Sequence, residues 1–101
     1  MDNKMNVISV VVLTYVKPLN EVDSLLPAHV EWLKKGYAEG LFLTSGPKIP
    51  RSGGVILAKC DDTEKLKNYL NQDPFQQSGI AKVELIPFEA TMTTAAIKDI
   101  L

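Results

Sequence analysis

The segment VISVVVLTYV, residues 7–16, is apolar at nearly every position and is rich in β-branched side chains. A run of this kind is typical of a central strand that is covered on both faces, because successive strand side chains point to opposite sides of a sheet. Lys17-Pro18 ends the run without a small-residue cleavage site, and its ten residues are too few to span a bilayer. We therefore expect a central strand here, and neither a signal peptide nor a membrane segment.

A helix is expected next, from about Pro27 to Glu39, after a polar connector at residues 17–24. Proline is tolerated in the first helical turn, and Gly40 supplies a stop after the last turn. Apolar residues at helical spacing predict a stripe that faces the core, made of Leu26, Val30, Leu33 and Tyr37.

The rest of the chain alternates short apolar runs with polar and turn-forming stretches. Further strands are predicted at residues 41–45, 55–60 and 80–88. A second helix is predicted at residues 62–71, opened by a capping box of Asp61 and Glu64, and residues 93–101 are compatible with a short terminal helix. The order βαββαβ predicts an α+β, ferredoxin-like sandwich in which two helices cover one face of a four-stranded antiparallel sheet.

The first strand carries apolar side chains on both of its faces. Residues of one face are Ile8, Val10 and Val12, and residues of the other are Val11, Leu13 and Tyr15. Because helices cover only one face of such a sheet, the second face would expose an apolar patch too large for a monomer. We therefore expect a homodimer in which sheet packs against sheet.

The composition narrows the range of functions. The 101 residues fit one domain, residues 1–101, and 46% apolar residues, 23% charged residues and a net charge of −1 are ordinary for a globular protein. No cluster of Lys and Arg gives a basic face, which argues against a nucleic-acid partner and against a membrane surface. Cys60 is the only cysteine, so an intramolecular disulfide is impossible and a reducing, cytoplasmic location fits best. One histidine without metal-ligand spacing predicts no metal site, and we expect no cofactor.

His29 is the only histidine, so any imidazole chemistry must run through it. On a helical wheel it lies at the edge of the predicted apolar stripe, where a side chain can border a pocket. A histidine in such a position is, however, often a partly buried structural residue. Asp73, in the triplet Asp73-Pro74-Phe75, is the candidate carboxylate that fixes its tautomer. An Asp before Pro is also a good helix N-cap. The two roles are compatible, because one carboxylate oxygen can accept a backbone N–H while the other faces the imidazole.

Several motifs together resemble the YciI-like (YCII-related) family. They are His29-Val30-Glu31-Trp32-Leu33-Lys34-Lys35, the run from Gly40 to Pro47, Asp73-Pro74-Phe75 and Gly79, with Pro50-Arg51 before Gly53-Gly54-Val55 as in a subgroup of the family. The resemblance implies a ferredoxin-like fold of the dimeric α/β-barrel type with a pocket between helices and sheet. It also implies a catalytic His/Asp pair, which falls on His29 and Asp73.

The resemblance also points to a type of chemistry. Relatives include a dehydrochlorinase that acts on a chlorinated hydroxyquinol, and the wider fold includes muconolactone isomerase, so lyase or isomerase chemistry on small oxygenated rings is expected. Many members carry Arg three residues before the histidine, whereas this chain has Leu26. If that Arg holds an anionic substrate, Arg51 or Lys17 takes over the task here.

Three further residues are candidates for contact with a substrate. Ser45, before Gly46-Pro47, ends a strand and offers a hydroxyl, although a plain turn explains the motif equally well. Tyr15, at the end of the first strand, offers a phenol, whereas an aromatic residue in a strand is more often core or interface. Trp32 is expected as a pocket wall or a dimer contact.

Three classes of function remain. The favoured class is a cofactor-free enzyme in which His29, oriented by Asp73, moves a proton on a small polar or aromatic substrate. The second is a non-catalytic module that binds a small molecule in the same pocket. The third is a dimeric accessory domain with a vestigial pocket.

Overall fold

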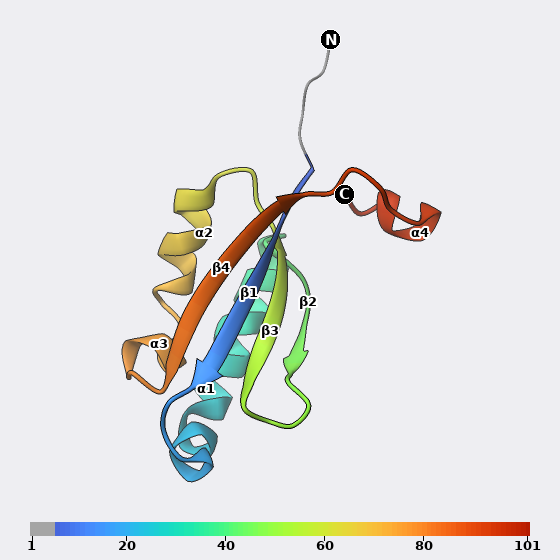
Figure 1. Cartoon of the computed structure of the whole chain (residues 1–101). Helices are drawn as coiled ribbons and strands as arrows, with labels where there is room; N and C mark the ends of the chain where they lie inside the picture. Colours follow the sequence, from blue (N-terminus) through green and yellow to red (C-terminus); the bar gives the residue numbers. More distant parts are fainter. Residues whose placement is uncertain (1–5) are drawn as a thin grey trace.

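A computed structural model describes residues 6–101. Its elements in chain order are β1 (Val7–Tyr15), α1 (Leu19–Ala38), β2 (Phe42–Pro47), β3 (Gly53–Lys59), α2 (Thr63–Leu70), α3 (Pro74–Gln77), β4 (Ala81–Glu89) and α4 (Ala95–Lys98). The four strands form one antiparallel sheet in the order β2-β3-β1-β4 (Figure 1). This is the expected α+β, ferredoxin-like arrangement.

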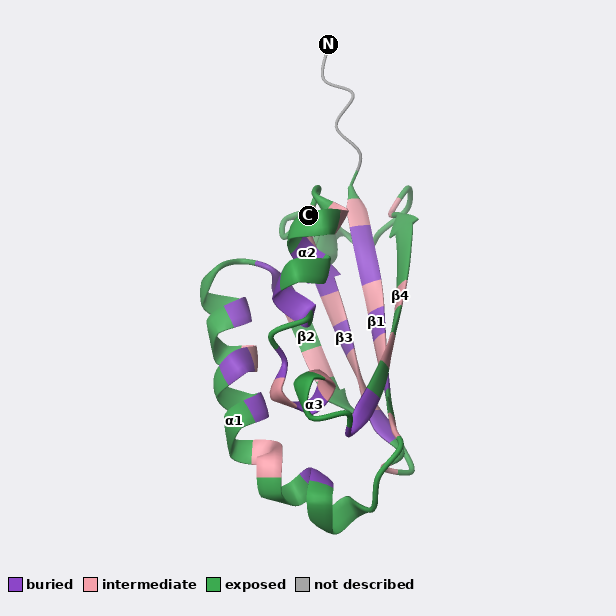
Figure 2. Cartoon of the chain, turned by 90° about the vertical axis from the view of Figure 1, so that its left-hand side faces the viewer, coloured by how far each residue is buried: buried purple, intermediate pink, exposed green. Residues whose placement is uncertain are grey.

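The apolar run at the start of the chain forms the centre of the sheet, as predicted. β1 pairs with β3 on one side and β4 on the other, so that Val11 lies opposite Ile56 and Leu85. Helices α1, α2 and α3 lie on one side of the sheet, and the buried stretches of α1 and α2 turn toward it (Figure 2). The core between these layers contains Val11, Leu13, Val22, Trp32, Leu41, Phe42, Ile56, Ala58, Leu66, Tyr69, Leu70, Phe75, Ile80 and Ala81.

The opposite face of the sheet carries a second set of apolar side chains. Its positions alternate with those of the core, because strand side chains point to the two faces in turn. Cross-strand pairing aligns Val10 with Leu57 and Ile86, and Ile8 with Phe88. Ile86 is 43% exposed and Phe88 is 48% exposed. Figure 1 shows no helix layer in front of these strands.

Helix α1 begins eight residues earlier than the sequence indicates, and the expected connector at residues 17–24 is wrong. Pro18 stands at the N-cap, where its fixed φ and missing N–H suit the end of β1 and the start of a helix. Pro27 therefore lies inside the helix and does not open it. A proline inside a helix removes one backbone hydrogen bond and bends the axis, and α1 changes direction along its length (Figure 2).

The buried side of α1 is also rotated relative to the predicted stripe. Its buried residues are Val22, His29, Trp32 and Gly36. Val30 and Tyr37, which were expected to face the core, are exposed at 36% and 39%. The core side needs a small residue at Gly36, where an added Cβ would lie 2.2 Å from the ring of Phe42. Close packing of β2 against α1 therefore sets the rotation of the helix.

The second half of the chain follows the prediction with small shifts. Helix α2 begins at Thr63, and Asp62, not Asp61, caps it by accepting hydrogen bonds from the N–H groups of Glu64 and Lys65. The short terminal helix α4 falls inside the region 93–101 where one was expected. Among the helices of residues 6–101, none combines the length and apolarity that a membrane crossing requires.

Candidate active site

Asp73 owes its position to the start of α3. It precedes Pro74, adopts an extended backbone conformation and accepts a hydrogen bond from the N–H of Phe75 at 3.0 Å. This is the N-cap that the sequence predicts, with proline at the first helical position. The cap is buried, since Asp73 is only 1% exposed. A carboxylate is thus held in a buried place by the backbone of α3.

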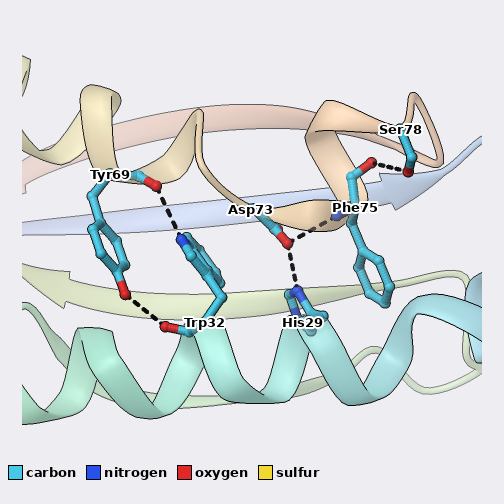
Figure 3. A network of polar contacts seen from close by, with 6 residues as sticks. All are labelled: His29, Trp32, Tyr69, Asp73, Phe75 and Ser78. Carbon is cyan, nitrogen blue, oxygen red and sulfur yellow. Dashed lines mark hydrogen bonds and ion pairs between the residues drawn. The ribbon is translucent and has the colours of Figure 1, made fainter.

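His29 reaches this carboxylate from the buried side of α1. Its Nδ1 lies 2.7 Å from Asp73 Oδ1, the same oxygen that caps α3 (Figure 3). The expectation that one carboxylate oxygen caps α3 while the other faces the imidazole is therefore wrong, because Oδ1 makes both contacts. The second oxygen, Oδ2, is buried without a hydrogen-bond partner within residues 6–101. An ionised carboxylate only accepts hydrogen bonds, so with Asp73 ionised the proton of this contact belongs to Nδ1 of the imidazole. Nε2 is then the ring nitrogen with a free lone pair.

Aromatic rings fix the plane of the imidazole. His29 stacks on Phe75 with ring centres 4.0 Å apart and planes 6° apart, and Trp32 stacks on the opposite side at 5.6 Å (Figure 3). Trp32 is itself clamped to α2, since its Nε1–H donates to the carbonyl of Tyr69 and the Tyr69 hydroxyl donates to the carbonyl of Trp32. Burial is the main cause that raises the pKa of Tyr69, and the negative charge of Glu39 raises it further, so the phenol stays protonated and can donate.

A pocket of about 370 Å³ adjoins the exposed part of the imidazole. It lies between α1, α3 and the ends of β1, β2 and β3. Its lining residues are Leu13, Tyr15, Leu26, His29, Val30, Leu33, Ser45, Gly46, Pro47, Arg51, Gly54, Val55, Ile56 and Phe75. Three of the four residues predicted to form a core stripe therefore face this pocket. The volume lies in the range of small-molecule sites, which are mostly apolar with a few polar groups.

The structure places most of the predicted contact residues in this pocket. Tyr15, Ser45 and Arg51 line it together with His29. Trp32 does not: it is 7% exposed and lies in the core, because its buried indole N–H pairs with a backbone carbonyl of α2. Its predicted roles as pocket wall or dimer contact do not match this position. Lys17, the alternative anchor, is exposed and is not a lining residue.

Two residues near the pocket were not anticipated from the sequence. Tyr37, which was assigned to the core, forms a hydrogen bond with Ser45 between their hydroxyl oxygens at 2.7 Å. Asp23, in the stretch predicted as a connector, accepts a hydrogen bond from Arg51 Nη2 at 2.6 Å. That bond raises the pKa of Arg51, so the guanidinium remains charged. No signal in the sequence pairs Tyr37 with Ser45 or Asp23 with Arg51.

Residues 6–101 contain no group of three or more His, Cys, Asp or Glu side chains placed to hold a metal ion. The polar chemistry of the pocket thus rests on an imidazole, a guanidinium and two hydroxyl groups.

Comparisons with known proteins place the chain in a family. The model of the YCII-related domain matches residues 8–89, which include every residue of the pocket and Asp73. The chain belongs to the YCII-related domain family. It is also similar in fold to a solved structure, the 5-chloro-2-hydroxyhydroquinone dehydrochlorinase TftG from Burkholderia phenoliruptrix in complex with 2,5-dihydroxybenzoquinone, with a TM-score of 0.66. The two sequences are 15% identical, and the likeness covers 80% of this chain and 90% of TftG. A comparison with curated proteins finds no match.

Proposed function

We propose that this YCII-related protein is a cofactor-independent enzyme that transfers a proton on a small polar or aromatic metabolite, in chemistry of the lyase or isomerase type. The observation that carries the proposal is the 2.7 Å contact between His29 Nδ1 and Asp73 Oδ1 beside a pocket of about 370 Å³. The carboxylate fixes the tautomer, and Nε2 is left to accept or return a proton. His29 is the proposed base and acid, and Asp73 is its positioning residue.

The pocket suits a single ring with polar substituents. An apolar cavity of about 150 Å³ holds benzene, so a pocket about two and a half times that size has room for oxygen substituents as well. Leu26, Val30 and Leu33 give it an apolar wall, and Ser45 and Arg51 place polar groups elsewhere on its surface. The dehydrochlorinase that shares the fold acts, by its name, on a ring of this kind. We therefore propose a hydroxylated or oxygenated ring as the substrate class.

The proposal is tested with 5-chloro-2-hydroxyhydroquinone under anaerobic conditions. Loss of one proton and one chloride ion converts this compound to 2-hydroxy-1,4-benzoquinone, with no oxidant or reductant required. We expect the protein to accelerate chloride release, His29→Asn to abolish the acceleration, and Asp73→Asn to reduce it. Glu31→Gln is the control, because Glu31 is an exposed residue of the same helix and pairs only with Lys34 in the described contacts. No acceleration by the unaltered protein would overturn the dehydrochlorinase-like assignment.

A second candidate function is a non-catalytic module that binds a small molecule. The low exposure of His29, 9%, and its position between Trp32 and Phe75 favour this candidate, because little of the ring is open to a reacting atom. Binding of the same probe without chloride release, with equal affinity in His29→Asn, supports the module over the enzyme.

We also propose that the protein is a homodimer. Support comes from the sheet face opposite the helices, where Val10, Leu57, Ile86 and Phe88 form an apolar surface. Packing two such faces together removes this surface from water, and a closed pair is the commonest symmetry of soluble oligomers.

A further inference from the structure

Arg51 is the one Lys or Arg among the described residues that line the pocket. It comes from the loop between β2 and β3, and this loop is tied at both ends by backbone hydrogen bonds. Ser52 accepts from the N–H of Tyr15 at 2.9 Å, and Gly53 accepts from the N–H of Lys48 at 2.9 Å. The backbone at Arg51 is therefore held in place, and its side chain brings a positive charge to the pocket.

The positive charge of Arg51 is paired with a carboxylate that does not line the pocket. Arg51 Nη2 donates to Asp23 Oδ1 at 2.6 Å, and Asp23, on α1, is absent from the lining residues. The two side chains are 36% and 55% exposed. An ion pair in contact with water contributes little to stability, so its carboxylate can be exchanged for another anion at small loss. While the pair is intact, however, it offsets the positive charge that the pocket offers to a ligand.

We propose that the pocket takes a ligand with an anionic oxygen, a carboxylate or an ionised ring hydroxyl, which binds Arg51 in place of Asp23. Asp23 is then a built-in competitor that lowers the affinity for anions and eases their release. A guanidinium has five N–H donors in a planar fork that matches such oxygens. The inference rests on the proposed function in one respect, that this pocket is the ligand site, and it does not require proton transfer by His29.

The test compares two probes that differ by one charge, 2,5-dihydroxybenzoate and 2,5-dihydroxybenzamide, by titration calorimetry on the full chain. Asp23→Asn removes the competing charge, so the benzoate should bind about threefold tighter and the benzamide with unchanged affinity. Arg51→Gln should weaken the benzoate about tenfold and leave the benzamide unaffected. In the double variant, Asp23→Asn should have no further effect, because the two residues act through one contact.

Glu31→Gln serves as the matched control. Glu31 is a carboxylate of the same helix in an exposed pair with Lys34 at 3.1 Å, so the substitution makes the same change in net charge away from the pocket. It should leave both affinities unchanged. The proposal is overturned if Asp23→Asn has no more effect than this control, if it strengthens the benzamide equally, or if the benzoate binds to neither protein. His29→Asn, measured in parallel, should keep the effect of Asp23→Asn, so loss of chloride release and loss of anion recognition are separate results.

Discussion

Replacing Asp73 by Ala removes two interactions that one oxygen makes. The first is the N-cap of α3, and loss of such a cap costs about 1 kcal/mol. The second is the acceptor of His29 Nδ1–H, and a buried donor without a partner costs about 1–3 kcal/mol. Asp73→Ala should therefore lower the free energy of unfolding by about 2–4 kcal/mol. Asp73→Asn keeps an oxygen that can accept both hydrogen bonds, and it should stay within about 1 kcal/mol of the unaltered protein.

Urea unfolding followed by fluorescence measures this difference directly, because Trp32 is the only tryptophan and stacks beside His29. Protein concentration is held constant, since association changes apparent stability. Asp62→Ala is the matched control: Asp62 caps α2 in the same way but has no imidazole partner, so its loss should cost about 1 kcal/mol. Equal losses for Asp73→Ala and Asp62→Ala would refute a stabilising contact between Asp73 and His29.

Three further outcomes are expected. Light scattering should report twice the chain mass, and Phe88→Glu should shift the mass toward the monomer, whereas an unchanged mass would exclude the proposed sheet interface. Gly53→Ala should destabilise the protein by about 3 kcal/mol or more in urea, because its Cβ would lie 1.8 Å from the carbonyl oxygen of Leu13, while Gly46→Ala, with open space around its Cβ, should be tolerated. Burial raises the pKa of Tyr69, so the folded state holds this proton more tightly, and stability should fall as pH rises above about 10. Tyr69→Phe should show a shallower fall over that range, and parallel curves would contradict the linkage.

The sheet and the cap could be predicted because their signals are local. The β-branched, apolar run at residues 7–16 is typical of a strand between two others, and Asp73 before Pro74 has the residue types favoured at the N-cap and first position of a helix. The pairing of His29 with Asp73 joins residues 44 positions apart and has no local signal, so it entered only as a hypothesis, since the chain has no other imidazole. The resemblance to the family supplied the remaining support.

The errors arise where contacts distant in sequence decide the outcome. The rotation of α1 depends on Phe42 packing against Gly36, which periodicity within the helix does not reveal. The position of Trp32 depends on an acceptor at Tyr69, 37 residues away. At Pro27 the sequence indicates a helix start, because a proline inside a helix is unfavourable on its own, whereas the folded chain accommodates it inside α1.

Specificity was the least predictable feature. The contact between Asp23 and Arg51 joins residues 28 positions apart, and one of them lay in a segment expected to be irregular. Exposed charged residues carry no periodic signal, because their position in the sequence is compatible with many partners. Only the folded arrangement shows that a carboxylate on α1 meets the one guanidinium of the described pocket lining.

The protonation state of His29 tests the central claim most directly. Nitrogen-15 NMR of the imidazole gives an unambiguous signal, since no other histidine is present. With Asp73 Oδ1 as acceptor, the neutral ring should carry its proton on Nδ1 and show an unprotonated Nε2. A neutral ring protonated on Nε2, as prevails for free imidazole side chains in water, would contradict the orientation by Asp73 and with it the proposed acid and base chemistry.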